Sequence, residues 1–210
     1  HMHGATESAG SVVFEYYEHG VASVLPTAGT VRGGTMLDIS VIGGAKANMT
    51  CLFGSGDGWQ STSATHTSSS MLMCRSPRGK SCSEVMVEVS RNGVDFTRDG
   101  VKFRYMADAE ATGLQPSAGP EAGGTVLTVL GRGFSAGAPM PVCRVGTRQV
   151  LRAVWRSSSS VSCVTAGHAR GNATVEVSMN GQEFSGRGLQ FSFEGLVSVV
   201  SVMPSMGPMR

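Results

Sequence analysis

The chain has few charged residues and no block of one sign. Charged residues make up 15% of its 210 residues, and the net charge is +2. Proteins that bind nucleic acid or an anionic membrane through their surface field usually gather Lys and Arg on one stretch or face. We therefore expect no nucleic-acid partner.

Long apolar runs and helical patterns are also missing. The longest apolar run, at 196–203, is interrupted by serines, whereas a helical membrane span needs about 20 apolar residues. No segment keeps an apolar period of about 3.6 residues over three turns behind a capping residue. We expect an all-β fold that does not itself cross a membrane.

What the sequence does contain is a tandem repeat. The matching pairs are VEVSRNGVDFT (87–97) with VEVSMNGQEFS (175–185), PTAGTVRGGT (26–35) with PSAGPEAGGT (116–125), and GVKFRYM (100–106) with GLQFSFE (188–194). Their order and spacing define a repeat of about 90 residues, the size of a whole small domain. We expect domains at 21–108 and 112–195, joined by a short linker, AEATG, at 109–113.

The repeat continues past both domains. VVFEYYE at 12–18 is similar to the closing strand of an earlier copy, and MPSMGPMR at 203–210 to the opening of another. We therefore expect residues 1–20 to combine a cloning remnant, His1-Met2, with that closing strand. Residues 196–210 are expected to be a linker and the start of a further repeat. The alternative is that both ends are linkers with accidental similarity.

Alternating apolar residues predict the strands. Val87 and Val89 are expected to face one side of a strand while Glu88 faces the other. The same alternation occurs after each Gly-Gly-Thr, at Leu37, Ile39 and Val41 and at Leu127 and Val129. The pairs Asn92-Gly93 and Asn180-Gly181 are typical of type I′ hairpins, and Phe96, Phe103, Phe184 and Phe191 follow them as expected core aromatics. About seven short strands per domain are expected.

Four of the five cysteines recur at matching places. Superposing the copies aligns Cys51 with Cys143 and Cys74 with Cys163. We predict the disulfides Cys51–Cys74 and Cys143–Cys163. In a chain-entropy model, closing each loop stabilises the folded domain by roughly 3 kcal/mol. The alternative is reduced, buried cysteines that act as small apolar side chains. Cys82 has no counterpart in the second copy and is predicted to be an unpaired surface thiol.

No arrangement of residues typical of a catalytic or metal site stands out. The chain has no Cys pair at zinc-finger spacing, and its histidines stand apart. GSGDGW at 54–59 is glycine-rich but misses the dinucleotide-binding pattern. We expect no enzyme activity, no cofactor and no metal.

Three residues are predicted to lie on the surface and to carry function. The sequons at Asn48 and Asn172 are predicted N-glycosylation sites, with Asn172 in a loop. Trp59 follows the glycine-rich segment and is the candidate contact with a partner. Trp155 is expected to be buried or half-buried.

The motif order resembles that of IPT/TIG domains, which have an immunoglobulin-like fold. The first copy carries it as Pro26, Gly33-Gly34-Thr35, Cys51-Leu-Phe-Gly54, Cys74-Arg-Ser-Pro77, Asn92-Gly93 and Phe103-Arg-Tyr105. The second carries Pro116, Gly123-Gly124-Thr125, Cys143-Arg-Val-Gly146, Cys163, Asn180-Gly181 and Phe191-Ser-Phe193. It departs from the pattern at Thr165-Ala166, where a proline is missing.

The resemblance implies two tandem immunoglobulin-like β-sandwiches. Tandem, disulfide-bearing copies are similar to those of extracellular receptors and adhesins such as plexins, fibrocystin-like proteins and algal gamete adhesins. It thus implies a non-catalytic, extracellular, semi-rigid rod for cell–cell adhesion or receptor recognition, in a membrane-anchored parent protein. The implied partner is a protein on an opposing cell or in the same array, with a glycan as a further ligand.

Two other functions stay open. A carbohydrate-binding accessory module of a secreted enzyme would need an exposed aromatic platform. A transcription-factor dimerisation domain is disfavoured by the paired cysteines and the lack of a basic patch.

Overall fold

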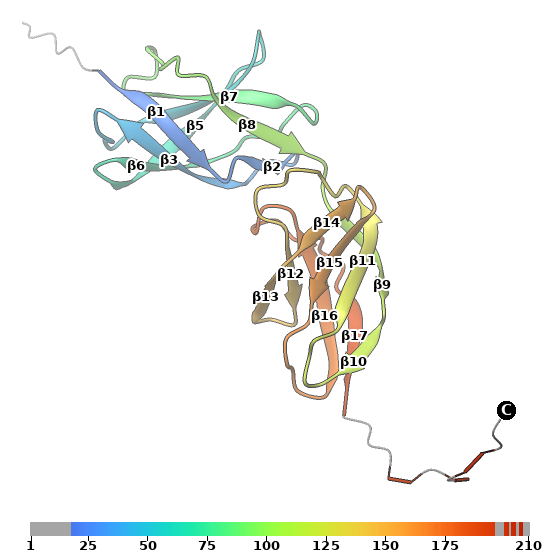
Figure 1. Cartoon of the computed structure of the whole chain (residues 1–210). Coiled ribbons are helices and arrows are strands. Elements are labelled where there is room, and N and C mark those ends of the chain that lie inside the picture. The colour runs from blue at the N-terminus through green and yellow to red at the C-terminus, as the bar shows by residue number, and fades with distance from the viewer. Residues whose placement is uncertain (1–17, 196–199, 202, 205, 208–210) are drawn as a thin grey trace, which may run out of the picture.

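The computed structural model describes residues 18–195, 200, 201, 203, 204, 206 and 207 (Figure 1). The regular elements within these residues are all strands. None of the described residues forms a helix long and apolar enough to cross a membrane. The expected closing strand at 12–18 lies outside the described residues except for Glu18, and the expected repeat start at 203–210 is described only in part.

The first domain is a sandwich whose two sheets share one long strand. Its strands are β1 (Gly20–Leu25), β2 (Ala28–Thr30), β3 (Met36–Ile42), β4 (Thr50–Gly54), β5 (Gln60–Ser68), β6 (Met71–Arg75), β7 (Glu84–Ser90) and β8 (Val101–Met106). They pair in the order β1-β3-β6-β5-β4-β7-β8-β2. The first half of β5 pairs with β4 and the second half with β6, so β5 passes from one layer to the other.

The second domain repeats this plan with the shared strand divided in two. Its strands are β9 (Glu110–Gln115), β10 (Ala118–Pro120), β11 (Val126–Arg132), β12 (Val142–Val145), β13 (Gln149–Arg152), β14 (Val154–Ser157), β15 (Ser160–Val164), β16 (Gly171–Ser178) and β17 (Leu189–Glu194). One sheet has the order β10-β17-β16-β12-β13 and the other β14-β15-β11-β9. The break between β13 and β14 falls at the buried Ala153.

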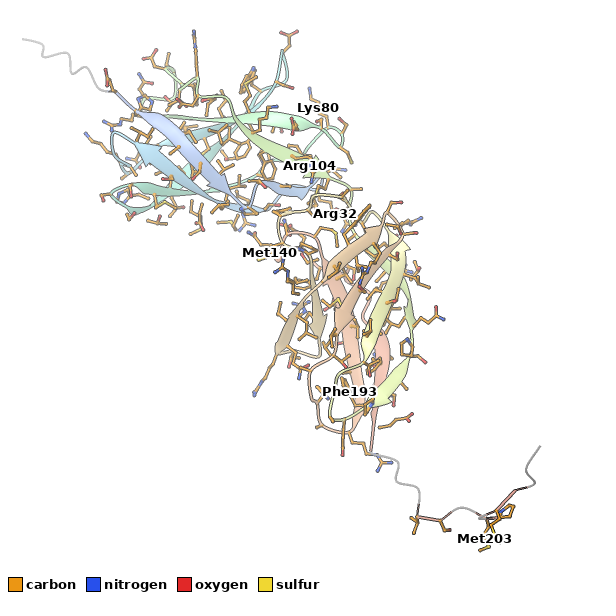
Figure 2. The ribbon with its side chains drawn as sticks, viewed as in Figure 1. Arg32, Lys80, Arg104, Met140, Phe193 and Met203 are labelled. Atoms are coloured by element: carbon orange, nitrogen blue, oxygen red, sulfur yellow. A yellow bond between two sulfur atoms is a disulfide. The ribbon has the colours of Figure 1, made fainter. Side chains whose placement is uncertain are left out.

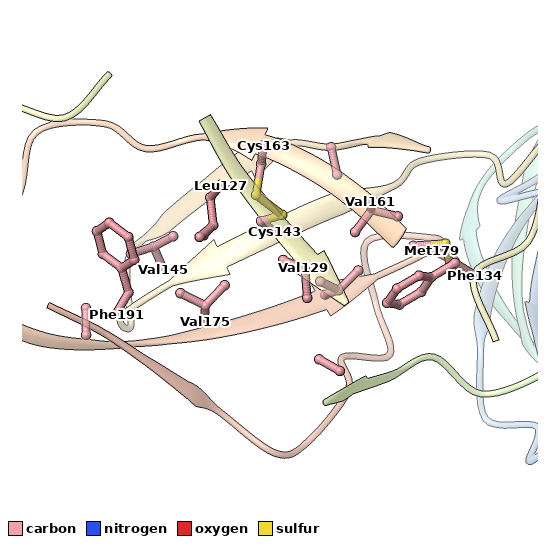
Figure 3. Close-up of a cluster of buried hydrophobic side chains, with 14 of the residues drawn as sticks. Leu127, Val129, Phe134, Cys143, Val145, Val161, Cys163, Val175, Met179 and Phe191 are labelled. Atoms are coloured by element: carbon pink, nitrogen blue, oxygen red, sulfur yellow. A yellow bond between two sulfur atoms is a disulfide. The ribbon is translucent and has the colours of Figure 1, made fainter. Parts of the chain in front are cut away.

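The expected fold class, two tandem immunoglobulin-like β-sandwiches, is confirmed. The domains contain eight and nine strands rather than about seven each. Leu37, Ile39 and Val41 all point into the first core, as their alternation predicted. In the second core Leu127 and Val129 lie around the Cys143–Cys163 bond (Figure 3). Burial of such apolar side chains is the main stabilising term in a domain of this size.

The outward face of β7 differs from expectation because Glu88 is buried. Its side chain accepts hydrogen bonds from the Thr97 hydroxyl and from the backbone N–H groups of Asp99 and Gly100. A buried carboxylate is tolerated when its oxygens are hydrogen-bonded in this way. The loop after β7 thus folds over the position that alternation assigned to solvent, and Glu88 holds the loop there.

The Asn-Gly turns are not type I′ hairpins. Gly93 has a φ of 73° and Gly181 one of 79°, but neither asparagine has a positive φ. Instead the Asn92 side-chain oxygen accepts hydrogen bonds from the N–H groups of Val94 and Asp95, which is an Asx turn. Phe103 and Phe191 are buried as predicted, whereas Phe96 and Phe184 are only half-buried.

The segment predicted to be a linker is a strand. AEATG at 109–113 lies almost entirely in β9, which pairs with β11 of the second domain. Only residues 107–109 separate β8 of the first domain from β9. Three residues leave little freedom between the domains, so their relative placement depends on the contacts at the junction.

The glycine of each P-x-A-G motif is required by packing. A Cβ on Gly119 would overlap the Thr125 hydroxyl and lie 3.0 Å from Cζ of Phe191. Gly29 has the same relation to Thr35 and Phe103. The motif therefore brings a short parallel strand against the core aromatic: β10 against β17, and β2 against β8.

We expect Gly119→Ala to destabilise the second domain by about 1–3 kcal/mol, because the added methyl group overpacks the site. The measurement is the urea unfolding midpoint. The matched control is Gly113→Ala, since a Cβ there meets only the Leu130 side chain at 3.8 Å. Equal midpoints for the two variants would contradict the packing argument.

Candidate functional site at the domain junction

Each domain has one disulfide that joins its two sheets. Cys51 on β4 is bonded to Cys74 on β6, and Cys143 on β12 to Cys163 on β15, with a Cα–Cα distance of 6.5 Å in both. All four cysteines are buried. Such bonds limit the freedom of the unfolded chain and so support small cores.

A thiol titration tests this pairing. In denaturant without reductant we expect one reactive thiol per chain, from Cys82, and five after reduction. Cys82→Ser should lower the first value to zero and serves as the control. Five reactive thiols before reduction would contradict both disulfides.

Cys82 is exposed and unpaired in the structure. It lies in the loop between β6 and β7, at the side of the first domain that faces the second. The structure thus places it beside the domain junction, a position that its sequence neighbours did not indicate.

Trp59 and Trp155 lie in different domains and form no common aromatic platform. Trp59 precedes β5 and is 39% exposed. A Cβ on Gly54 would lie 2.8 Å from its ring, so the glycine leaves the space that the indole occupies. Trp155 is 38% exposed, more than expected, and its Nε1–H donates a hydrogen bond to the Phe134 carbonyl at 3.0 Å.

Both sequon asparagines are exposed. Asn48 is in the turn before β4 with a φ of 63°, a conformation that Asn tolerates better than most residues. Asn172 lies in strand β16 opposite Ser192, not in a loop as predicted. Each side chain can be reached by solvent.

The described residues contain no group of three or more His, Cys, Asp and Glu side chains that could hold a metal ion. His66 is exposed on β5, and His168 stacks on Phe193 with ring centroids 4.6 Å apart. Tyr105 donates a hydrogen bond to the Pro77 carbonyl at 2.8 Å, and burial raises the pKa of its phenol to about 12. His168 and Tyr105 thus make contacts within their own domains.

The junction is built around the Asn180-Gly181 turn of the second domain. The Gln182 amide receives a hydrogen bond from the Met36 N–H at 2.9 Å and donates one to the Met36 carbonyl at 2.8 Å. The Asn180 side chain donates to the Ala28 carbonyl at 3.3 Å. The turn thus pairs with β2 and β3 of the first domain through backbone groups.

A second polar contact and an apolar contact complete the junction. Arg104 on β8 donates to the carbonyls of Ala136 and Gly137 in the loop after β11. Ala28 and Met106 of the first domain are packed into the buried cluster of the second. Figure 2 shows Arg104, Arg32 and Met140 gathered where the domains meet. The domains are joined at a steep angle, so the pair is bent (Figure 1).

Comparison of the two copies shows how much of this surface the contact covers. The residues of β2 are all buried, whereas those of the matching β10 are partly exposed. Asn180 is 2% exposed, and its counterpart Asn92 is exposed. Yet the first turn has the same internal hydrogen bonds as the second, to Ser90 and Asn92 in place of Ser178 and Asn180. The turn is therefore preformed in both copies and docked in one.

No sequence pattern pointed directly to these contacts. The partners are far apart in the chain, and Gln182 stands where the first copy has Val94. The one available signal was the short distance between the repeats, since two sandwiches joined by three residues must touch.

Loss of the polar junction contacts should loosen the pair. For the double variant Gln182→Ala, Arg104→Ala we expect a broader distribution of interdomain distances in small-angle scattering, because four hydrogen bonds of about 1 kcal/mol each are removed. Gln190→Ala, an exposed glutamine of β17 without a side-chain hydrogen bond to the described residues, is the matched control. An unchanged scattering profile for the double variant would show that the apolar contact alone fixes the angle.

Known proteins resemble this chain in its second domain and in its fold. A family model for the IPT/TIG domain matches residues 110–193. Mouse plexin-B2 is 30% identical over 109 residues, which are 51% of this chain and 6% of the plexin. A structure of the full extracellular region of plexin A4 covers 75% of this chain and 14% of its own at 18% identity, with a TM-score of 0.51.

The chain therefore spans a small part of the relatives that it matches. Buried disulfides persist in oxidising compartments and are rare in the cytosol. With one disulfide inside each domain, the chain is an extracellular segment.

Proposed function

Because the second domain is an IPT/TIG domain and the first repeats its strands and disulfide, we propose that this segment acts in cell–cell adhesion or receptor recognition without catalysis. It would do so as part of a membrane-anchored parent protein that binds a protein on an opposing cell or in the same array. The observation that carries this proposal is the domain junction, because a fixed angle presents the surfaces of two domains together.

The free ends of the pair support a longer array of such domains. The exposed turn at Asn92 has the internal geometry of the turn that docks on the first domain. At the other end, the residues of β10 are partly exposed. Val126 occupies the position of Met36 in the first copy and is 60% exposed. We propose that residues 1–20 and 196–210 belong in part to neighbouring repeats, whose domains would cover these two surfaces.

Exposed features that only the first copy carries are the candidate contacts with a protein partner. Trp59 combines a large apolar surface with an indole N–H group. Tryptophan is enriched among the few interface residues that contribute most of the binding free energy. N-glycans on Asn48 and Asn172 would cover other faces and so restrict where a partner can bind.

A binding assay on intact cells tests the function. Residues 1–210, biotinylated at one end and tetramerised on streptavidin, should bind saturably to cells of the source organism, and trypsin treatment of those cells should abolish the binding. The double variant Gln182→Ala, Arg104→Ala should bind several-fold more weakly, since it presents its surfaces at variable angles.

The control for this assay is Gln190→Ala, which should bind like the natural chain. Binding that trypsin leaves intact, or no saturable binding on any cell type of the organism, would contradict recognition of a cell-surface protein.

A further inference from the structure

Two adjoining hollows form a groove beside the domain junction. One, of about 670 Å³, extends from Arg32 across residues 107–110 to Arg132 and Arg187 of the second domain. The other, of about 720 Å³, extends from Arg32 along the first domain to Arg78 and Lys80. They share Val31, Arg32, Cys82 and Asp108, so together they make one continuous depression.

The groove is strongly basic although the chain is nearly neutral. Five cationic and two acidic side chains line it, an excess of three charges within a protein whose net charge is +2. These cations come from four distant parts of the sequence, so no basic block was visible there. Concave surfaces lined by one sign of charge concentrate ions of the opposite sign.

The two acids orient arginines and do not neutralise the whole groove. Asp108 binds Nε of Arg32 at 2.6 Å, and Glu110 binds the guanidinium group of Arg132. The arginine side chains are 78% and 77% exposed, while the acids lie lower, at 30% and 32%. A guanidinium group has five N–H donors, so each of these arginines keeps donors that point to solvent.

The other three cations have no such partner. Arg78, Lys80 and Arg187 are exposed, and their side chains form no hydrogen bond or ion pair with the described residues. In Figure 2, Lys80 and Arg32 lie toward the end of the first domain that adjoins the second. The groove therefore presents donors on both of its walls and along its length.

We propose that this groove binds a sulfated polysaccharide chain. Sulfate groups suit guanidinium forks, which bind planar or tetrahedral oxyanions through two N–H groups. An extended polymer with repeated anionic groups matches an open depression that crosses two domains, whereas the lining offers only small apolar groups, such as Val31, Ala107 and Ala109, for an apolar ligand. The extracellular location of the chain favours a sulfated glycan over a nucleic acid.

This proposal goes beyond the proposed adhesion function and does not need it. The ligand is a polyanion held in the groove, and the protein partner would be bound elsewhere. The two are separable on cells, because heparinase removes the first class of ligand and trypsin the second.

The test uses a heparin octasaccharide and the whole chain, with affinity measured by calorimetry in about 50 mM and 300 mM NaCl. We expect binding that weakens with salt, because exposed charges are screened beyond about 10 Å at 0.1 M. The variant Arg78→Gln, Lys80→Gln, Arg187→Gln should bind at least about tenfold more weakly, since each exposed ion pair contributes a few-fold in affinity. Thermal unfolding of this variant should be unchanged, because none of the three side chains has a partner to lose.

The matched control is Arg148→Gln, Arg152→Gln, Arg170→Gln. It removes the same charge from three exposed arginines of the second domain that do not line the groove. It should change the affinity less than about threefold. Equal losses in the two triple variants, equal affinity for chemically desulfated heparin, or no binding at low salt would overturn the proposal. Displacement by poly-glutamate at equal charge concentration would overturn it in favour of an acidic peptide.

Cys82 gives a second, independent readout because it lines both hollows. Saturating octasaccharide should slow the alkylation of Cys82 by neutral iodoacetamide several-fold, and desulfated heparin should leave the rate unchanged. An unchanged rate with the sulfated sugar would place the ligand outside the groove.

Discussion

The arrangement of the two domains depends on one turn of the second domain. Gln182 bonds to both backbone groups of Met36, and Asn180 bonds to the Ala28 carbonyl. The partners of these two side chains on the first domain are backbone groups, so these hydrogen bonds do not depend on which side chains Ala28 and Met36 carry. The bend of the pair, the cover over β2 and the basic groove all follow from this docking, since the groove has one wall on each domain.

The parts of the fold that the sequence predicted are those governed by short-range patterns. Alternation at Leu37, Ile39 and Val41 identified a strand and its buried face, because a strand has a period of two. It failed at Glu88, where the loop after the strand supplies hydrogen bonds that no pattern encodes. The Asn-Gly pairs marked the turns correctly, but the Asn92 side chain, not a positive φ, shapes the first of them.

The candidate site could not be predicted in the same way, because it is assembled from both domains. Arg32, Arg78, Arg132 and Arg187 are far apart in the sequence and meet only once the junction has set the angle. The net charge and the distribution of charges along the sequence therefore did not indicate a basic groove. The repeat did predict where to look for differences, since Cys82 and Trp59 occur in the first copy alone.

The disulfides also determine how each domain carries mechanical load. A force that pulls on the two ends of the first domain passes through the Cys51–Cys74 bond and bypasses the chain segment between these cysteines, which are 23 positions apart. That segment includes β5, the strand that belongs to both layers. If tension opens the sandwich, strands outside the covalent loop can lengthen the chain, while the loop itself stays slack. Each domain thus has a built-in limit on its extension.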